Sequence, residues 1–274
     1  MSMSGIQIRG VSKIFGAGAD KAIALVEQGL SKAEILEKTG CGVGLRNITL
    51  DIPAGEIFVI MGLSGSGKST LVRHLNRLIE PSAGEIFFDN TNVLTLGRKE
   101  LRAFRTNRIS MVFQSFALAP HKTVLQNVIY GQISRGTARK QAEAIGMEWI
   151  AKVGLSGYEH RYPDQLSGGM KQRVGLARAL AADTDVILMD EAFSALDPLI
   201  RSDMQDQLLQ LQRDLAKTIV FITHDLDEAL RIGSRIAILK DGELVQVGTP
   251  NDILANPAND YVARFVQGRT AVHA

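Results

Sequence analysis

The sequence lacks most of the features that mark secreted and membrane-spanning proteins. It contains a single cysteine, Cys41, in 274 residues, so no disulfide can form within the chain, which favours a reducing cytosol. The opening residues, MSMSGIQIRG, have neither the basic start nor the long apolar stretch of a secretory signal. The longest apolar runs, such as IFVIMGL, are well short of the ~18 to 20 residues that a membrane helix requires. We therefore expect any membrane role to be carried out through a partner.

An excess of charge of one sign is also lacking. The 31 Lys and Arg residues are nearly balanced by 29 Asp and Glu residues, which leaves a formal net charge of +2. This balance predicts no strong field for binding a polyanion. With 45% hydrophobic and 22% charged residues, the composition is that of an ordinary globular chain. The length allows one or two domains with a full core.

Short apolar runs rich in Val, Ile and Phe indicate strands that are buried on both faces. These runs are EIFVIM (56–61), ISMVFQ (109–114), DVILMD (185–190) and TIVFITH (218–224). Near the end of the chain, RIAILKDGELVQVGTP contains a Lys-Asp-Gly turn between two alternating runs, which predicts a hairpin. The stretch 115–180 lacks buried strands and is predicted to be mostly helical.

Helical patterns lie between the predicted strands. The first is expected to end at Pro81. Its apolar stripe consists of Leu71, Leu75, Leu78 and Ile79. A later helix is predicted to begin with Asp197 as N-cap and Pro198 as first residue. Its stripe consists of Ile200, Met204, Leu208 and Leu211. The alternation of strands with helices favours an α/β fold with a mainly parallel sheet.

Residues 62–69 read GLSGSGKS and fit the phosphate-loop pattern G-x-x-x-x-G-K-[ST], in the required position after a buried strand and before a helix. Glycines let backbone N–H groups surround phosphate oxygens, and the helix N-terminus adds a partial positive charge. Lys68 is predicted to reach the β- and γ-phosphates of ATP, and the Ser69 hydroxyl to ligate Mg²⁺. The predicted nucleotide contacts of this loop are Gly62, Ser64, Gly65, Ser66, Gly67, Lys68, Ser69 and Thr70.

Two adjacent carboxylates, Asp190 and Glu191, end the apolar run DVILMDE. Buried parallel strands present such groups at the sheet edge where ligands bind. We predict that Asp190 holds Mg²⁺ and that Glu191 orients or deprotonates the attacking water. An acidic pair after a strand is more often part of a solvated loop, but the upstream phosphate loop favours the catalytic interpretation.

A second potential anion site is formed by Ser167, Gly168 and Gly169 in LSGGM, at the start of the predicted helix KQRVGLARALA. Taken alone, this pattern is more typical of an ordinary helix N-cap. A phosphate loop, Ser-Gly-Gly and an Asp-Glu strand end occur here in that order. In this arrangement the chain resembles the ATPase subunit of ATP-binding cassette (ABC) transporters, from about residue 6 to about residue 267.

The resemblance implies a P-loop NTPase fold with a RecA-like core, an antiparallel β subdomain and an inserted α-helical subdomain. It predicts one domain over 1–274, with a nucleotide-binding core at 6–114 and 181–267 and a helical signature subdomain at 115–180. A helical insertion at 20–42 belongs to the core. Within it, Ser31 and Glu34 form a predicted capping box, and Gly40 ends the second of two short helices.

The resemblance also assigns roles to matching residues. Gln114 is implied to sense Mg²⁺ and the attacking water, and His224 to contact the γ-phosphate. The loop Ser194-Ala195-Leu196-Asp197 is implied to cross a dimer seam, where Asp197 contacts nucleotide. Phe15 is implied to stack on adenine, although a Phe near a strand end is more often part of a core. The expected catalytic residues are thus Lys68, Gln114, Glu191 and His224, and the expected metal ligands are Ser69, Gln114 and Asp190.

The family forms its sites between two cassettes. The residues matching Ser167 and Gly169 of one protomer close over the ATP bound at Lys68 of the other, which implies an ATP-sandwiched homodimer. The implied partners are integral membrane permease subunits and, indirectly, a substrate-binding protein, with no role for nucleic acid. The implied location is peripheral, on the cytoplasmic face of the inner (cell) membrane.

Two longer segments narrow the resemblance. FVIMGLSGSGKSTLVRHLNRLIEP and MVFQSFALAPHKTVLQNV resemble the ATPases of glycine betaine and proline betaine importers, which also have an insertion like residues 24–40. The implied cargo is a compatible solute such as glycine betaine, proline betaine, choline, carnitine, proline or trimethylamine N-oxide. Because the sequence ends at Ala274, paired CBS modules that sense ionic strength are expected to be absent.

Alternatives from other classes have less support. An importer for another small solute, such as an amino acid, shares the same motifs. A non-transport ABC ATPase of translation or DNA repair would normally have two cassettes or long coiled-coil insertions, and neither pattern occurs. A helix-turn-helix at 24–40 would need a basic reading helix, whereas Glu27, Glu34 and Glu37 offset its lysines.

Overall fold

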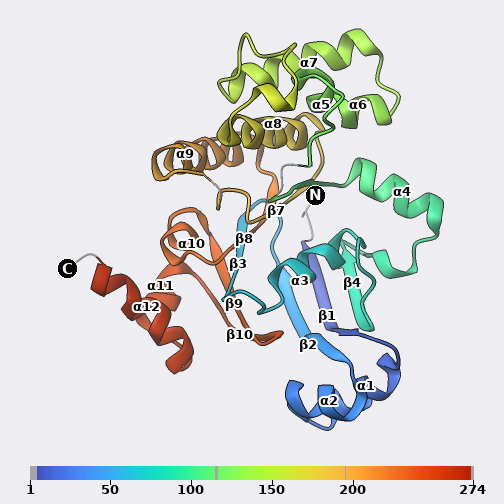
Figure 1. The fold of residues 1–274 in the computed structure, drawn as a ribbon, viewed down its shortest axis with the longest axis vertical. Coiled ribbons are helices and arrows are strands. Elements are labelled where there is room, and N and C mark those ends of the chain that lie inside the picture. The colour runs from blue at the N-terminus through green and yellow to red at the C-terminus, as the bar shows by residue number, and fades with distance from the viewer. Residues whose placement is uncertain (1–4, 115–116, 195, 273–274) are drawn as a thin grey trace. The chain divides into compact units, whose positions relative to one another are not determined.

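The computed structural model describes residues 5–114, 117–194 and 196–272 (Figure 1). The chain divides into two compact units. The first consists of Met1–Gly97 with Ile222–Ala274, and the second of Arg98–Phe221. One strand, β8 (Thr218–Thr223), passes from the second unit into the first.

An antiparallel sheet occupies the first part of unit one. Its strands lie in the order β2-β1-β4-β5. They are β1 (Ile6–Phe15), β2 (Gly42–Ile52), β4 (Ala83–Phe88) and β5 (Thr91–Asn92). Ile8 pairs with Leu50 on one side and with Ile86 on the other, and all three side chains are buried. A short 3-10 helix, η1 (Val93–Thr95), follows β5.

Parallel and hairpin pairing combine in the rest of unit one. The fully buried strand β3 (Ile57–Met61) pairs in parallel with β9 (Arg235–Lys240). The predicted hairpin is present, because β9 pairs with β10 (Glu243–Gly248) through a turn in which Asp241 and Gly242 have φ values of 48° and 76°. The helices of this part are α3 (Lys68–Leu75), α10 (Leu226–Ile232), α11 (Pro250–Ala255) and α12 (Asp260–Val272).

Helix α3 is shorter than its apolar stripe predicts. It ends at Leu75, so Leu78 and Ile79 lie outside it, and Leu78 is 51% exposed. Arg77 adopts a left-handed φ of 51°, and the side chain of Asn76 accepts a hydrogen bond from the Leu78 amide. The helix therefore ends in this turn, six residues before Pro81, and the prediction that Pro81 ends it was wrong.

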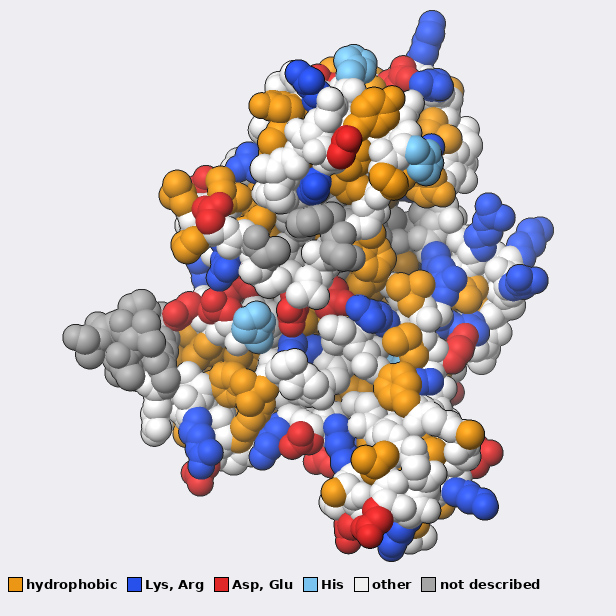
Figure 2. All heavy atoms as spheres, in the orientation of Figure 1, with side chains coloured by type: hydrophobic (Ala, Val, Ile, Leu, Met, Phe, Trp, Pro, Cys, Tyr) orange, Lys and Arg blue, Asp and Glu red, His pale blue; other side chains and the backbone are white. Residues whose placement is uncertain are grey.

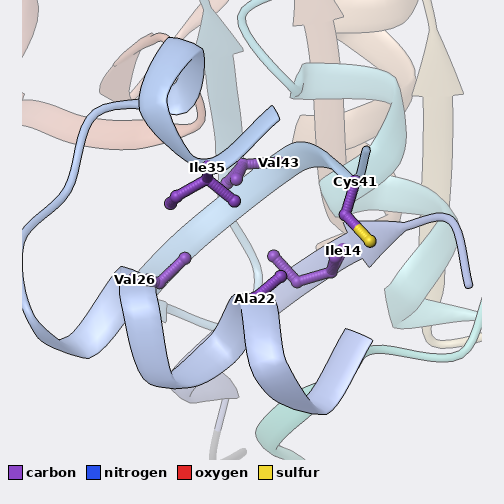
Figure 3. Close-up of a cluster of buried hydrophobic side chains, with 6 residues drawn as sticks. All are labelled: Ile14, Ala22, Val26, Ile35, Cys41 and Val43. Atoms are coloured by element: carbon purple, nitrogen blue, oxygen red, sulfur yellow. The ribbon is translucent and has the colours of Figure 1, made fainter. Parts of the chain in front are cut away.

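The predicted helical insertion forms a small hydrophobic cluster of its own (Figure 3). Helices α1 (Ala19–Glu27) and α2 (Lys32–Thr39) pack against β1 and β2. The cluster consists of Ile14, Ala22, Val26, Ile35, Cys41 and Val43. The Ser31–Glu34 capping box and the left-handed Gly40 bound α2 as expected from the sequence. The insertion is therefore a folded addition to the edge of the antiparallel sheet.

Unit two combines a parallel strand pair with a group of helices. Strand β6 (Ile109–Val112) pairs in parallel with β7 (Val186–Asp190), which is buried along its whole length. Its helices are α4 (Arg98–Asn107), α5 (Val124–Val128), α6 (Tyr130–Ser134), α7 (Arg139–Lys152), the 3-10 helix η2 (Pro163–Gln165), α8 (Gly168–Ala181) and α9 (Pro198–Leu215). Figure 2 shows Lys and Arg side chains gathered over α4, where Arg98, Lys99 and Arg102 are exposed. As predicted, Asp197 caps α9 by accepting a hydrogen bond from the Ile200 amide.

Among the helices of the described residues, we find none that combines the length and the apolar character needed to cross a bilayer.

Candidate functional site

The glycine-rich loop of unit one joins β3 to α3, as its sequence predicts. Lys68 is 4% exposed, and its ammonium donates hydrogen bonds to the carbonyl oxygens of Gly62 (2.9 Å) and Leu63 (3.1 Å). These bonds curl the loop around the lysine side chain. The loop therefore holds a buried cation at the start of a helix.

Gly67 is required at this helix start by both conformation and space. Its φ is 101°, and an added Cβ would lie 2.9 Å from the Gly44 carbonyl oxygen and 2.7 Å from a methyl group of Leu45. A side chain here would strain the backbone and separate the loop from β2. Gly65 also has positive φ (78°), but an added Cβ there would meet nothing within 4 Å. The loop is thus packed tightly on the β2 side and is open at Gly65.

Several groups of this loop fit a phosphate chain. Gly67 caps α3 without a side-chain hydrogen bond, so no side chain of the cap takes the place that an anion would occupy. The hydroxyl of Ser66 is buried and has no hydrogen-bond partner among the described residues. Ser69 and Thr70 lie in the first turn of α3 and are half-buried. A buried cation, an unpartnered hydroxyl and a helix start therefore converge on one loop.

Phe15 lies beside this loop, at the end of β1. Its side chain is 45% exposed, and the Lys13 ammonium lies 5.2 Å from its ring centroid. An added Cβ on Gly44 would be 2.6 Å from the Phe15 ring, and the carbonyl of the same Gly44 touches Gly67. Phe15 and the phosphate loop are therefore separated only by Gly44. An exposed ring at this position is available for stacking.

The β9–β10 hairpin braces the loop from another side. The Gly242 amide donates to the Ser66 carbonyl (3.0 Å), and the Arg46 amide donates to the Gly242 carbonyl (2.8 Å). The Arg46 guanidinium also donates to the Leu30 carbonyl between α1 and α2. A chain of hydrogen bonds therefore joins the insertion, strand β2, the hairpin tip and the phosphate loop.

His74 lies on α3, beyond the loop. The ring is fully buried, and its Nδ1 lies 2.7 Å from the Ile79 carbonyl oxygen, to which the neutral ring can donate. Burial lowers the pKa of His74 below its usual range, and the nearby Lys13 cation acts in the same direction. The hydrogen bond to Ile79 raises the pKa of this imidazole, but by less than burial lowers it. The neutral form is therefore the one that fits this position.

The predicted carboxylates lie in unit two, at the end of β7. Asp190 is the last residue of the strand and is 3% exposed. Glu191 follows with a left-handed φ of 47°. Both the amide (3.2 Å) and the hydroxyl (2.9 Å) of Ser194 donate to the Glu191 carbonyl oxygen and support this turn. A left-handed non-glycine residue at the end of a buried strand is typical of functional sites.

Gln114 meets Glu191 directly. Its side-chain nitrogen donates a hydrogen bond to a Glu191 carboxylate oxygen over 3.2 Å. Strand β6 ends at Val112, so Gln114 lies in the turn beyond the strand. The sequence-based placement of Gln114 as the last residue of its strand was wrong, because the chain turns after Val112. The amide and the carboxylate that were assigned to the same chemistry nevertheless lie in contact.

The Ser-Gly-Gly segment lines an open cavity of ≈ 580 Å³ in unit two. Ser167 caps α8 by accepting a hydrogen bond from the Met170 amide (3.3 Å). The cavity is lined by Ser167, Gly168, Gly169, Asp197, Tyr158 and Arg173, together with apolar side chains. The predicted anion site and the predicted nucleotide contact Asp197 thus share one cavity. Ala195 of the neighbouring loop lies outside the described residues.

His224 directly follows β8 in unit one and is exposed. The buried Thr223 hydroxyl accepts a hydrogen bond from the Asp225 amide (3.0 Å), and Asp225 in turn caps α10 by accepting from the Glu228 amide. These bonds fix the backbone on the C-terminal side of His224. The ring is therefore presented from a rigid strand end.

The structure groups the predicted residues within each unit. Unit one brings together Phe15 and the phosphate loop. Unit two brings together Gln114 with Glu191, and the Ser167 segment with Asp197. Sequence reasoning missed two residues. Gly44 lies between the Phe15 ring and Gly67 of the phosphate loop. Arg46 donates a hydrogen bond to the Leu30 carbonyl of the insertion. The only available signal was the pair of glycines in GVGLRN, which permits close approach of another backbone.

The sequence profile of the ABC transporter family matches residues 45–194. The chain belongs to this family. Among curated ABC relatives, the glycine betaine transport ATP-binding protein OpuAA of Bacillus subtilis is 58% identical over 96% of this chain and 63% of the relative. The trimethylamine N-oxide transport system ATP-binding protein TmoW of Pelagibacter ubique is 48% identical over 97% of this chain and 78% of the relative. The chain thus spans about two thirds of the length of its betaine relative (63%).

Among solved ABC structures, a dimeric post-hydrolysis state of the ATP-binding cassette MJ0796, bound to ADP and Pi, is similar to the chain. The TM-score is 0.76 and the identity 32%, over 89% of this chain and 98% of that chain. The predicted α/β P-loop NTPase fold of ABC ATPases is confirmed by this similarity and by the family match.

Proposed function

We propose that this chain is the ATP-hydrolysing subunit of an ABC importer for a quaternary-amine or related compatible solute. The observation that carries this proposal is the phosphate loop, where the buried Lys68 ammonium, the unpartnered Ser66 hydroxyl and the helix start at Gly67 fit a triphosphate. The relatives named above are ATP-binding proteins of glycine betaine and trimethylamine N-oxide transport systems. The phosphate loop supports the nucleotide, and the similarity to these relatives supports the cargo class.

The proposed mechanism divides the chemistry among residues of this chain. Backbone amides of the loop and Lys68 bind the β- and γ-phosphates, and Phe15 stacks on adenine. Glu191 orients the attacking water and accepts its proton, Gln114 holds the Glu191 carboxylate and the water, and His224 donates a hydrogen bond to the γ-phosphate. Catalysis then rests on positioning and charge stabilisation without a covalent intermediate.

Mg²⁺ would neutralise charge that develops on the phosphate oxygens. We assign it to the Ser69 hydroxyl, the Gln114 side chain and the Asp190 carboxylate. Within the described residues no group of three or more His, Cys, Asp or Glu side chains is arranged to hold a metal ion by itself. This donor set suits Mg²⁺, which is usually held by one or two carboxylates together with water and nucleotide phosphates.

We further propose that two copies of the chain act as a homodimer. The cavity lined by Ser167, Gly169 and Asp197 has one arginine, Arg173, and no lysine in its lining, and we assign it to the triphosphate that is bound by Lys68 of a second copy. The related MJ0796 cassette has a dimeric structure with ADP and Pi. ATP would thus be enclosed between the copies, and its hydrolysis would release them.

Membrane permease subunits are the proposed second partner, with the chain bound peripherally at the cytoplasmic face. A cavity of ≈ 220 Å³ in unit two offers a docking place. It is lined by Arg105 and Thr106 of α4, by β6, by Tyr130 of α6 and by Arg178 of α8. Tyr130 is 58% exposed beside it. A half-apolar rim beside the basic α4 suits a short helical segment of a partner.

The Glu191→Gln substitution tests the enzymatic part. It keeps the size of the side chain and removes the carboxylate that would accept the proton, so kcat for ATP hydrolysis should fall by about 10² to 10⁴-fold, while ATP still binds. Glu143→Gln is the matched control, because Glu143 pairs with Arg139 on the exposed face of α7. Hydrolysis by Glu191→Gln at the wild-type rate would refute the assigned role.

Reconstitution tests the cargo class. The chain is combined with its permease and binding protein in vesicles, and ATP hydrolysis is measured with glycine betaine, proline betaine, choline, carnitine, proline and trimethylamine N-oxide in turn. We expect stimulation by at least one of these solutes. Stimulation by an amino acid other than proline, with no response to any of these solutes, would favour the alternative importer class.

A further inference from the structure

The start of the phosphate loop lies against the end of strand β9. The parallel pairing of β3 with β9 ends at the pair formed by Met61 and Ile238. One residue further along both segments, an added Cβ on Gly62 would clash with the Leu239 carbonyl oxygen. Only a residue without a side chain fits so close to a backbone carbonyl. The first residue of the loop is therefore in direct contact with the end of β9.

Tyr261 of α12 binds at this same contact. Its hydroxyl donates a hydrogen bond to the Leu239 carbonyl oxygen (3.3 Å), and its oxygen accepts one from the Leu63 amide of the loop. A phenol can do both at once. Burial raises the pKa of the Tyr261 phenol, and the hydrogen bond from Leu63 offsets only part of this rise. The neutral hydroxyl thus joins the end of β9 to the phosphate loop.

The ring of Tyr261 is held in place by its neighbours. The Lys240 ammonium lies 5.0 Å from the ring centroid, and the Phe265 ring packs edge-on against it with centroids 5.1 Å apart. The start of α12 is also anchored, because the Asn259 side chain accepts a hydrogen bond from the amide of the fully buried Val262 (3.1 Å). The hydroxyl therefore has a defined position relative to the loop.

The peptide that joins Gly62 to Leu63 connects Tyr261 to Lys68. The carbonyl oxygen of this peptide, that of Gly62, accepts a hydrogen bond from the Lys68 ammonium (2.9 Å). The N–H of the same peptide, that of Leu63, donates to Tyr261. Because a trans peptide is planar, with its C=O and N–H pointing in opposite directions, fixing the N–H also fixes the direction of the C=O. The Leu63 carbonyl, one peptide further on, accepts a second bond from Lys68 (3.1 Å).

We propose that Tyr261 is a positioning residue for ATP binding, which fixes the Gly62–Leu63 peptide so that its carbonyl holds the Lys68 ammonium at the phosphate site. Tyr261 acts through the loop and does not itself bind the nucleotide. A residue of the C-terminal helix thus contributes to the affinity for ATP through two backbone groups and one lysine. The inference rests on the proposed ATPase function.

The Tyr261→Phe substitution tests the role of the hydroxyl in the whole chain. It keeps the ring and its contacts with Lys240 and Phe265, and it removes both hydrogen bonds. We expect the affinity for a fluorescent ATP analogue to fall about fivefold, the ordinary worth of one neutral hydrogen bond. KM for ATP should rise by a similar factor, whereas kcat at saturating ATP should stay within about twofold.

Tyr162→Phe is the matched control, because it removes a hydroxyl from a side chain that is 45% exposed and lies in unit two, away from the phosphate loop. It should leave both ATP affinity and kcat unchanged.

A double-mutant cycle separates positioning of Lys68 from general stabilisation. In a Lys68→Met background, Tyr261→Phe should weaken ATP binding by less than about twofold, because the ammonium through which Tyr261 acts is already gone. A merely structural role would weaken binding by the same factor in both backgrounds. Urea unfolding of the four proteins in the cycle shows whether each one is folded under the conditions of the binding measurement.

The outcomes distinguish this inference from the function on which it rests. Unchanged ATP affinity in Tyr261→Phe, or equal fold losses with and without Lys68, would overturn the positioning role. A wild-type chain that does not bind ATP would overturn the proposed function instead. We expect a loss that is clear with Lys68 present and largely disappears in its absence.

Discussion

Two helices of this chain begin after similar glycine- and serine-rich turns, but they begin differently. Helix α3 has Gly67 as its cap, with no side-chain hydrogen bond, and it buries Lys68 against the loop. Helix α8 is capped by the Ser167 hydroxyl and opens onto a cavity of ≈ 580 Å³. The start of α3 thus contains a buried lysine and is closely packed. The start of α8 has a side-chain cap and faces an open cavity.

The difference shows that a helix start alone does not define a phosphate site. At α3 the buried Lys68 ammonium and the tight turn at Gly67 lie together at the helix start. This loop therefore has its own cation for a phosphate group. At α8 the serine already satisfies one backbone donor, and Asp197 adds a negative charge to the cavity. Arg173 lines the cavity as well, but no lysine does, so an anion bound there would meet one cation and one carboxylate of this chain. This setting differs from the start of α3 and agrees with the role that we propose for it, contact with a nucleotide held by another copy.

The largest expected effect comes from removing the cation at the first start. Lys68→Met should reduce ATP affinity and hydrolysis by at least about 10²-fold, because a buried charge-assisted contact with the phosphates is lost. Equilibrium binding of a fluorescent ATP analogue measures this directly. The variant should keep its fold, since methionine suits a buried position. Unchanged ATP binding by Lys68→Met would show that the cation at the start of α3 does not contribute to phosphate binding.

A smaller effect is expected at the second start. Ser167→Ala should leave ATP binding by single chains unchanged but weaken ATP-driven dimerisation in a Glu191→Gln background by about tenfold, since a cap and a contact are lost together. Sedimentation with ATP measures the dimer. Ser31→Ala provides the control, because it removes a comparable serine cap from α2. Equal losses in both variants would assign the effect to capping alone.

The smallest effect concerns pH and the far end of α3. Because burial lowers the pKa of His74 in the folded chain, the unfolded chain binds the extra proton more readily. The contribution of His74 to the free energy of unfolding should be complete above about pH 6.5, the ordinary histidine pKa, and should decline as the pH falls below it. Urea unfolding at several pH values measures the slope. Replacement of His74 by glutamine should flatten it, whereas His121→Gln at an exposed position should not.

The parts of the site that could be predicted from the sequence are those with a local pattern. The phosphate loop, the Asp190–Glu191 strand end and the caps at Ser31 and Asp197 each depend on a few adjacent residues. The end of α3 depends on distant contacts, because Arg77 turns out of the helix to donate hydrogen bonds to the Val93 and Leu96 carbonyls.

Contacts between distant segments explain the other differences. Gln114 leaves its strand to reach Glu191, which lies 77 positions later in the sequence. The pairing of β1 with β2 and β4, and the bond from Arg178 to Ala117, likewise join residues that no single stretch of sequence brings together. Sequence patterns therefore predict which side chains could take part in the chemistry, but not the contacts between distant segments that position them.

The cluster beneath the helical insertion also gives this chain an internal chemical reporter. Cys41 is the only thiol in the sequence and is fully buried in that cluster, where its sulfur lies 3.3 Å from the Ala17 carbonyl oxygen. A thiol reagent can therefore reach it only when α1 and α2 open locally. The labelling rate of the unmodified protein would measure how often the insertion opens, and a change in that rate on adding ATP would show whether the insertion senses the phosphate loop through Arg46.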